Sequence, residues 1–149
     1  NFSEALRISP DDPDILLELG KAYLASGRTS DAITLLRRSY ELDDKDKETL
    51  LYLGRAYEEA GSYSTALEFY RQYSSKNPKD VNIFYNMAMA YGKTGNNARS
   101  HYYFALYFKN KNKVESALFH LKEAQKYGDP ELKAEIEKEI ELLRPPKKK

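Results

Sequence analysis

The sequence has 149 residues, a mass of 17.2 kDa and a formal charge of +1, from 24 Lys plus Arg against 23 Asp plus Glu. This balance excludes the basic bias of a dedicated nucleic-acid-binding protein, so we expect no nucleic-acid partner. The absence of cysteine excludes disulfides and thiolate metal sites. No apolar run approaches the roughly 18 residues of a membrane span, so none is expected.

The main feature of the sequence is a pattern that returns every 34 residues. The first copy consists of Leu19, Gly20, Tyr23, Gly27, Ala32 and Leu36. The second consists of Leu53, Gly54, Tyr57, Gly61, Ala66 and Tyr70. The third consists of Met87, Ala88, Tyr91, Gly95, Ser100 and Phe104. Apolar or small residues three and four apart indicate one face of a helix, and the later glycine marks a helix end. Each period therefore predicts two helices joined by a turn.

These positions resemble the tetratricopeptide repeat (TPR), a helix-turn-helix unit of this length. The resemblance covers about residues 1–128. It implies an all-α fold, a right-handed α-α superhelix in which antiparallel helix pairs stack into a solenoid. It also implies that the chain binds a protein or peptide.

Taken in chain order, the sequence predicts about nine helices and no strand. Residues 1–12 are interpreted as the second helix of a truncated repeat, with Phe2 partly uncovered, so we expect the chain to be a segment of a longer protein. Full repeats are predicted at 13–46, 47–80 and 81–112.

Helix starts are predicted from capping residues. Asp12 before Pro13 predicts the first helix of the 13–46 repeat, because aspartate caps free N–H groups and proline is tolerated at the first helical position. Thr29 or Ser30 is predicted to cap the second helix of that repeat.

The helix predicted at 97–110 has two interpretations. Its Ser100 and Phe104 fit the second helix of the third repeat, whereas Phe104, Ala105 and Phe108 fit the first helix of an irregular repeat at 98–129. The next predicted helix, 114–127, favours the second frame, which is offset by half a period. One helix is therefore predicted to serve both repeats.

The end of the chain is predicted to close the repeat array. Asp129 and Pro130 start a capping helix at 130–144, with an apolar stripe on one side and glutamates on the other. A basic tail follows at 145–149.

The sequence contains no catalytic constellation. Its histidines, His101 and His120, have no cysteine partners, and no H-E-x-x-H or glycine-rich phosphate motif is present. We expect both to be surface or helix-packing residues. The chain is therefore predicted not to be an enzyme and to need neither metal nor cofactor.

On the TPR template, a binding groove is lined by the first helix of each repeat. The predicted contact residues are Leu17, Lys21, Leu51, Tyr52, Arg55, Tyr85, Asn86, Met89, Tyr102 and Leu106. Aromatic residues, Met and Arg are enriched at binding surfaces. In the alternative interpretation, Tyr102 and Tyr103 pack against the next helix instead.

Some TPR proteins hold a peptide carboxylate with Lys and Asn at fixed groove positions. Here those positions hold Leu17, Lys21, Glu48, Tyr52, Asn82 and Asn86. Because Glu48 would repel a carboxylate, an extended or helical apolar segment is the expected ligand.

A second, narrower resemblance runs from Phe84 to Arg144. It rests on Ala88-x-Ala90-Tyr91, Gly95, Ala98-x-x-His101, Ala105-x-Tyr107, Ala117-Leu118-x-x-Leu121-x-x-Ala124 and Ile136-x-x-x-Ile140-x-x-Leu143-Arg144. This run is similar to the C-terminal TPR region of bacterial periplasmic zinc metalloproteases, the β-barrel-assembly-enhancing protease group. The resemblance implies an H-E-x-x-H catalytic domain outside this chain, with the repeats recruiting or regulating substrate. It also implies a periplasmic location; otherwise we expect a cytoplasmic one.

The sequence thus favours a scaffold or adaptor module that binds a partner polypeptide, with the protease region as the alternative. A further hypothesis is weak self-association through the truncated N-terminal helix.

Overall fold

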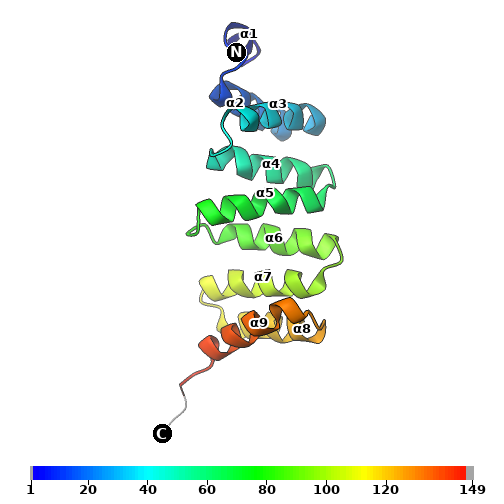
Figure 1. The fold of residues 1–149 in the computed structure, drawn as a ribbon, viewed down its shortest axis with the longest axis vertical. Coiled ribbons are helices and arrows are strands. Elements are labelled where there is room, and N and C mark those ends of the chain that lie inside the picture. The colour runs from blue at the N-terminus through cyan, green and yellow to red at the C-terminus, as the bar shows by residue number, and fades with distance from the viewer. Residues whose placement is uncertain (1, 147–149) are drawn as a thin grey trace. The chain divides into compact units, whose positions relative to one another are not determined.

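The structure, a computed structural model, describes residues 2–146, and the side chains of Phe2, Ser3 and Leu6 are not among its described features. These residues form nine helices and no strand (Figure 1). The predicted all-α fold of the TPR solenoid class is therefore confirmed. The predicted exposure of Phe2 lies outside the described features, as does the basic tail from Lys147 onward.

The chain divides into two compact units, Asn1–Pro78 and Lys79–Lys149. Unit 1 contains α1 (Phe2–Ile8), α2 (Pro13–Ala25), α3 (Thr29–Leu42), α4 (Lys47–Glu59) and α5 (Tyr63–Lys76). Unit 2 contains α6 (Asn82–Lys93), α7 (Asn97–Asn110), α8 (Val114–Lys126) and α9 (Pro130–Leu143). The helix boundaries fall close to those predicted from the repeat period. The repeat boundaries themselves stay predictions.

The capping residues explain where two of these helices begin. Asp12 accepts hydrogen bonds from the backbone N–H groups of Asp14 and Ile15 at 2.9 and 3.3 Å, and Asp129 caps α9 in the same way. The cap predicted for α3 is wrong. Arg28 is the N-cap residue and makes no side-chain cap bond. Thr29 is already helical, and its hydroxyl donates to Glu59 at 3.2 Å.

In unit 1, each helix pair closes around a glycine in its first helix. A Cβ on Gly20 would lie 2.7 Å from Leu36 Cγ, and one on Gly54 would lie 2.4 Å from the ring of Tyr70. Leu36 and Tyr70 are both fully buried at these contacts. The glycines therefore cost helix propensity but permit the two helices of each pair to approach closely.

In unit 2, α7 packs against three helices. Tyr91 of α6 is buried and stacks on Tyr103 of α7, with ring centroids 5.4 Å apart. On its other sides, α7 shares a core with α8 and α9 that includes Ala105, Leu121 and Ile136. Figure 1 shows these helices in succession, with α9 lying against α8.

The turn after α7 has the backbone geometry of the turns within helix pairs. Gly95 precedes α7 with φ 81°, and Asn112 follows α7 with φ 60°. Across the first turn Asn96 N donates to Tyr91 O at 3.0 Å, and across the second Lys113 N donates to Phe108 O at 2.9 Å. A helix shared by two repeats requires this pattern on both sides, and the shared-helix interpretation stays a prediction.

Candidate partner-binding surfaces

Unit 1 contains a surface hollow of about 580 Å³ between the exposed sides of α2 and α4. It is lined by Glu18, Lys21, Ala22, Leu24, Ala25, Tyr52, Arg55 and Glu59. Three predicted contact residues, Lys21, Tyr52 and Arg55, meet here. Leu17 is buried in the core of unit 1, and Leu51 is half-buried on α4.

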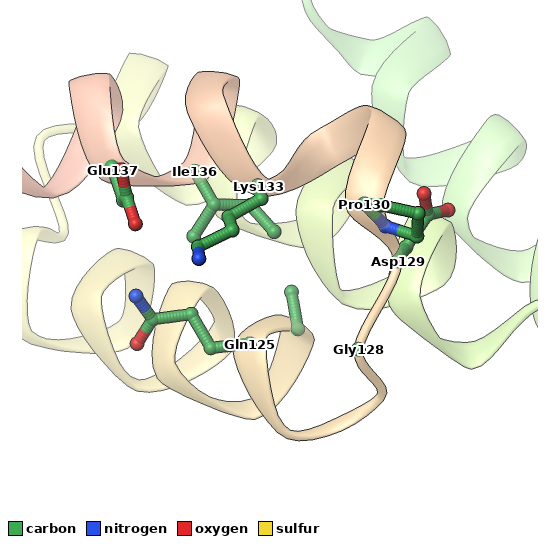
Figure 2. Close-up of a pocket in the computed structure, with 8 residues that line it drawn as sticks. Gln125, Gly128, Asp129, Pro130, Lys133, Ile136 and Glu137 are labelled. Atoms are coloured by element: carbon green, nitrogen blue, oxygen red, sulfur yellow. The ribbon is translucent and has the colours of Figure 1, made fainter.

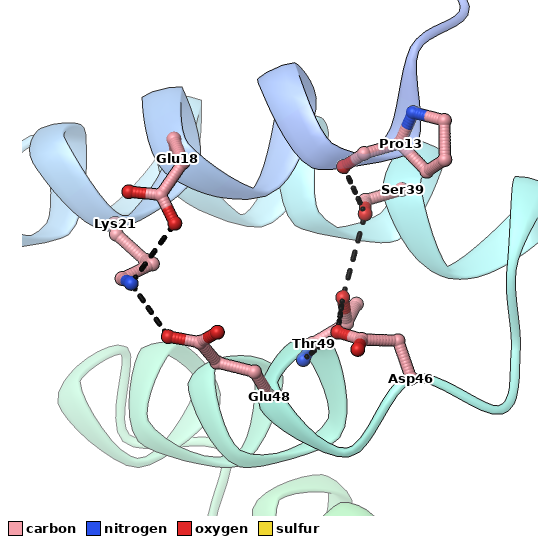
Figure 3. A network of polar contacts seen from close by, with 7 residues as sticks. All are labelled: Pro13, Glu18, Lys21, Ser39, Asp46, Glu48 and Thr49. Carbon is pink, nitrogen blue, oxygen red and sulfur yellow. Dashed lines mark hydrogen bonds and ion pairs between the residues drawn. The ribbon is translucent and has the colours of Figure 1, made fainter.

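The charge of Lys21 is already compensated within the hollow. Its ammonium donates to Glu48 at 2.5 Å and to Glu18 at 3.0 Å (Figure 3). These two hydrogen bonds raise the pKa of Lys21, and the bond to Glu48 is the larger cause. A partner carboxylate would have to compete with both acids. That these positions do not act as a carboxylate clamp stays a prediction.

Tyr52 is the aromatic centre of the hollow. Lys21 Nζ and Arg55 Cζ each lie 5.1 Å from its ring centroid, which is within cation–π range. Arg55 is exposed and makes no ion pair with any described carboxylate. The hollow therefore offers an apolar ring edge beside an available guanidinium.

In unit 2, the predicted contact residues lie on different sides of the helices. Tyr85 and Met89 are 45% and 40% exposed and lie one turn apart on α6, with Asn86 half-buried between them. Leu106 is half-buried on α7. Tyr102 packs against the α7–α8–α9 core, whereas Tyr103 stacks on Tyr91 of the preceding helix α6, so the alternative interpretation holds for Tyr102 alone. The pKa of the Tyr102 hydroxyl is raised to about 12, mainly by burial and to a smaller extent by the charges of the α9 acids Glu139 and Glu135.

Sequence reasoning missed a group of touching rings on α6, α7 and α8, here called the aromatic face. It comprises Tyr85, Phe104, Tyr107, Phe108, Phe119 and His120. The two overlapping repeat frames of α7 were the available signal, because each frame places large residues on a different side of that helix.

The two histidines, 19 residues apart in sequence, meet at the α7–α8 contact. His101 Nδ1 and His120 Nδ1 are 2.9 Å apart, and the His101 ring stacks on Tyr127. Burial, followed by the charge of His101, lowers the pKa of His120. Among the described residues no group of three His, Cys, Asp or Glu side chains could hold a metal ion. The histidines thus lie in helix packing contacts, as expected.

A second hollow in unit 2, of about 370 Å³, lies between the end of α8 and the start of α9 (Figure 2). Its lining brings Lys133 and Glu137 of α9 opposite Gln125 of α8. None of the predicted contact residues lines it. It carries one ammonium, of Lys133, and two carboxylates, of Glu137 and of Asp129, and Asp129 also caps α9.

The antiparallel helix pairs and their small-to-large contacts define an α-helical repeat protein. The family model for the tetratricopeptide repeat matches residues 1–47 and 17–81. The chain belongs to this family, whose role as protein-interaction scaffolds it shares. None of the helices in the described part of the chain combines the length and apolar character needed to cross a membrane.

Solved structures share the fold. A crystal structure of MamA has a TM-score of 0.72 at 20% identity and covers 95% of this chain and 82% of its own. A double mutant designated MamA RS-1 has a TM-score of 0.73 at 17% identity, with 95% and 80% covered. A form designated MamA MSR-1 has a TM-score of 0.65 at 19% identity, with 89% and 76% covered. No curated protein matches the sequence.

Proposed function

We propose that this chain binds a segment of a partner polypeptide along the exposed sides of its repeat helices and performs no chemistry of its own. The hollow of unit 1 carries the proposal, because three predicted contact residues line one surface depression of about 580 Å³. A ring flanked by two cations is suited to apolar and polar contacts at once. Tyr and Arg are also the residue types that most often dominate binding energy.

The test begins with capture of the native partner from cell extract and its identification by mass spectrometry. Its affinity is then measured by calorimetry for the wild type and for a variant with Tyr52, Tyr85 and Met89 all changed to Ala. We expect at least about a tenfold loss of affinity with helicity retained.

A matched control changes Leu42 and Leu142 to Ala. Both are exposed apolar residues, at 46% and 62%, and neither belongs to the predicted contact set. The control should bind the partner as the wild type does. Equal affinity of the triple variant and the wild type would remove these surfaces from the function.

The metalloprotease alternative rests on the sequence run from Phe84 to Arg144 and stays a prediction. In that case the chain would recruit or regulate substrate for a catalytic domain elsewhere in the parent protein. The discriminating observation is the parent reading frame. An H-E-x-x-H motif upstream supports the alternative, and a complete upstream sequence without it excludes that alternative.

A further inference from the structure

The aromatic face of unit 2 is uncovered at both edges. Tyr85 on α6 is 45% exposed and Phe119 on α8 is 57% exposed. Successive ring centroids are 5.5 Å apart from Tyr85 to Phe104, 5.2 Å from Phe104 to His120, and 5.2 Å from His120 to Phe119. Met89 extends the surface by one turn of α6. A contiguous aromatic and Met surface of this kind marks an interaction site, unlike single scattered apolar residues.

The last helix of the chain does not cover this face. Arg99 and Lys109 of α7 pair with Glu131 and Glu139 of α9 at 2.8 and 2.6 Å. With 3.6 residues per turn, Arg99 and Lys109 share one side of α7, and Phe104 lies on another. The aromatic face therefore remains open after α9 has docked.

The helices that carry the face are strongly biased toward positive charge. α6 and α7 contain no Asp or Glu, and residues 82–126 contain seven Lys plus Arg against two Glu. Of those two acids, Glu123 pairs with Lys126 at 2.5 Å, while Glu115 lies one turn before Phe119.

Three lysines beside the face have no carboxylate partner among the described residues. Lys93 lies one turn beyond Met89 on α6. Lys111 Nζ lies 5.6 Å from the ring centroid of Tyr107, and Lys113 follows in the same turn. With these three lysines against the one unpaired acid, Glu115, the net uncompensated charge beside the rings is positive.

We propose that the aromatic face binds an acidic amphipathic helix of a partner protein, with large apolar side chains on the rings and carboxylates toward Lys111 and Lys113. The inference rests on the proposed function and names the partner class for unit 2. Such a helix places apolar side chains at i, i+3 or i+4, and i+7 along one side.

The molecule already contains one contact of this chemistry. α9 is acidic, with an apolar stripe of Leu132, Ile136 and Ile140 in the core, and its glutamates pair with cations of α7. The proposed partner helix would use the same combination on the uncovered side of α7.

The experiment uses the full chain and three labelled synthetic helices of one apolar pattern, with Leu and Phe on one side. The polar positions carry Glu in the first peptide, Gln in the second and Lys in the third. Fluorescence anisotropy should show binding of the Glu peptide, weaker binding of the Gln peptide and none of the Lys peptide. Added salt should weaken binding of the Glu peptide, because exposed charges are screened.

One double variant locates the site. Tyr85→Ala with Phe119→Ala should weaken Glu-peptide binding at least about tenfold. Its control, Leu142→Ala, removes an exposed apolar side chain of α9 outside the face and should change nothing. Both original side chains are exposed, so circular dichroism should show an intact fold.

Charge is tested in the same way. Lys111→Glu with Lys113→Glu should weaken binding of the Glu peptide and strengthen binding of the Lys peptide. Lys133→Glu with Lys138→Glu makes the same change in net charge on exposed positions of α9 and should leave both affinities unchanged.

Three results would overturn the proposal: no binding of the Glu peptide, equal binding of the Lys peptide, or full binding by the Tyr85 and Phe119 variant. Self-association in light scattering that this variant abolishes would also overturn it, by assigning the face to a second copy. If the native partner still binds through Tyr52 while the Glu peptide fails, only this inference falls. If neither the native partner nor the peptide depends on these surfaces, the proposed function falls as well.

Discussion

The two units differ in how the large side chain of a second helix meets the first helix. In unit 1, Leu36 faces Gly20 and Tyr70 faces Gly54, and both large side chains are fully buried. In unit 2, the position 34 residues beyond Gly54 holds Ala88, and Phe104 in the next helix is only half-buried. Phe104 instead meets Tyr85, with ring centroids 5.5 Å apart.

The difference decides whether the large side chain of the second helix becomes part of the core or remains partly exposed. Where the first helix carries glycine, the backbone leaves room for the whole ring or branched chain. At Ala88 a methyl group takes the place of the glycine hydrogen, and Phe104 is half-buried and contacts the rings of Tyr85 and His120. The same repeat position thus supports the core in unit 1 and the aromatic face in unit 2.

The largest effect is expected when the large side chain at this repeat position is truncated to Ala in each unit. Leu36→Ala should lower the free energy of unfolding by about 2–5 kcal/mol, because it removes a fully buried side chain. Phe104→Ala should cost only about 1–2 kcal/mol, although more atoms are removed, because the ring is partly solvated. Denaturant unfolding followed by circular dichroism measures both. A larger loss for Phe104→Ala would mean that unit 2 buries this ring as unit 1 does.

The next effect comes from filling the space that a glycine leaves. Gly54→Leu should cost about 1–3 kcal/mol through overpacking, because even a Cβ would lie 2.4 Å from the buried Tyr70 ring. Ala66→Leu on the facing helix should have a similar cost, since Ala66 is also fully buried. Glu68→Leu, at an exposed position of α5, is the control. Unaltered thermal unfolding of the Gly54 and Ala66 variants would contradict the assigned helix contact.

Much of the fold could be predicted because small and large residues recur at one spacing. Gly20 and Leu36 lie 16 residues apart in sequence, and the repeat pattern brings them together. The hollow of unit 1 was partly predictable for the same reason. The aromatic face was not, since α7 fits two repeat frames and the pattern does not decide which side of it remains open. The Lys21 contact to Glu48 also depends on side-chain conformations that periodicity does not fix.

A smaller loss of stability is expected when either of two buried serines, one in each unit, is changed to Ala. In unit 1 the Ser39 hydroxyl donates to Pro13 O at 2.8 Å and lies 3.4 Å from Thr49 Oγ1 (Figure 3). In unit 2 the Ser100 hydroxyl donates to Ala88 O at 2.8 Å. Ser39→Ala should lower the free energy of unfolding by about 1–2 kcal/mol, and Ser100→Ala by less, because Ser39 is the more deeply buried of the two donors, at 1% exposure against 8%.

Combining Ser39→Ala with Thr49→Val in a double-mutant cycle measures the coupling between the two hydroxyls. We expect a coupling energy of about 0.5 kcal/mol or more, since the two side chains are in contact. Additive losses would show that each hydroxyl acts alone, through Pro13 or through Asp46.

The smallest effect concerns pH, and it is expected in unit 2, which holds both histidines. The pKa of His120 is lowered in the folded chain from an ordinary value of 6.5, so the unfolded chain binds more protons in mild acid. The folded chain therefore keeps its full stability above about pH 6.5, where His120 is neutral in both states. It loses stability as the pH falls below that value, because protons bind to the unfolded chain first. The charges facing His120 are His101 and the Glu123 carboxylate, and the acid opposes the lowering of the pKa as the smallest of the three causes. The 2.9 Å contact between the Nδ1 atoms also requires one neutral ring, whose Nδ1 carries no hydrogen and accepts from the other. The free energy of unfolding should decline in the wild type between pH 7.5 and 5.5, and His120→Gln should reduce that decline. Hydrogen-exchange protection in unit 1, corrected for the intrinsic exchange rate at each pH, should stay unchanged. An equal decline in the variant would assign the pH dependence to other groups.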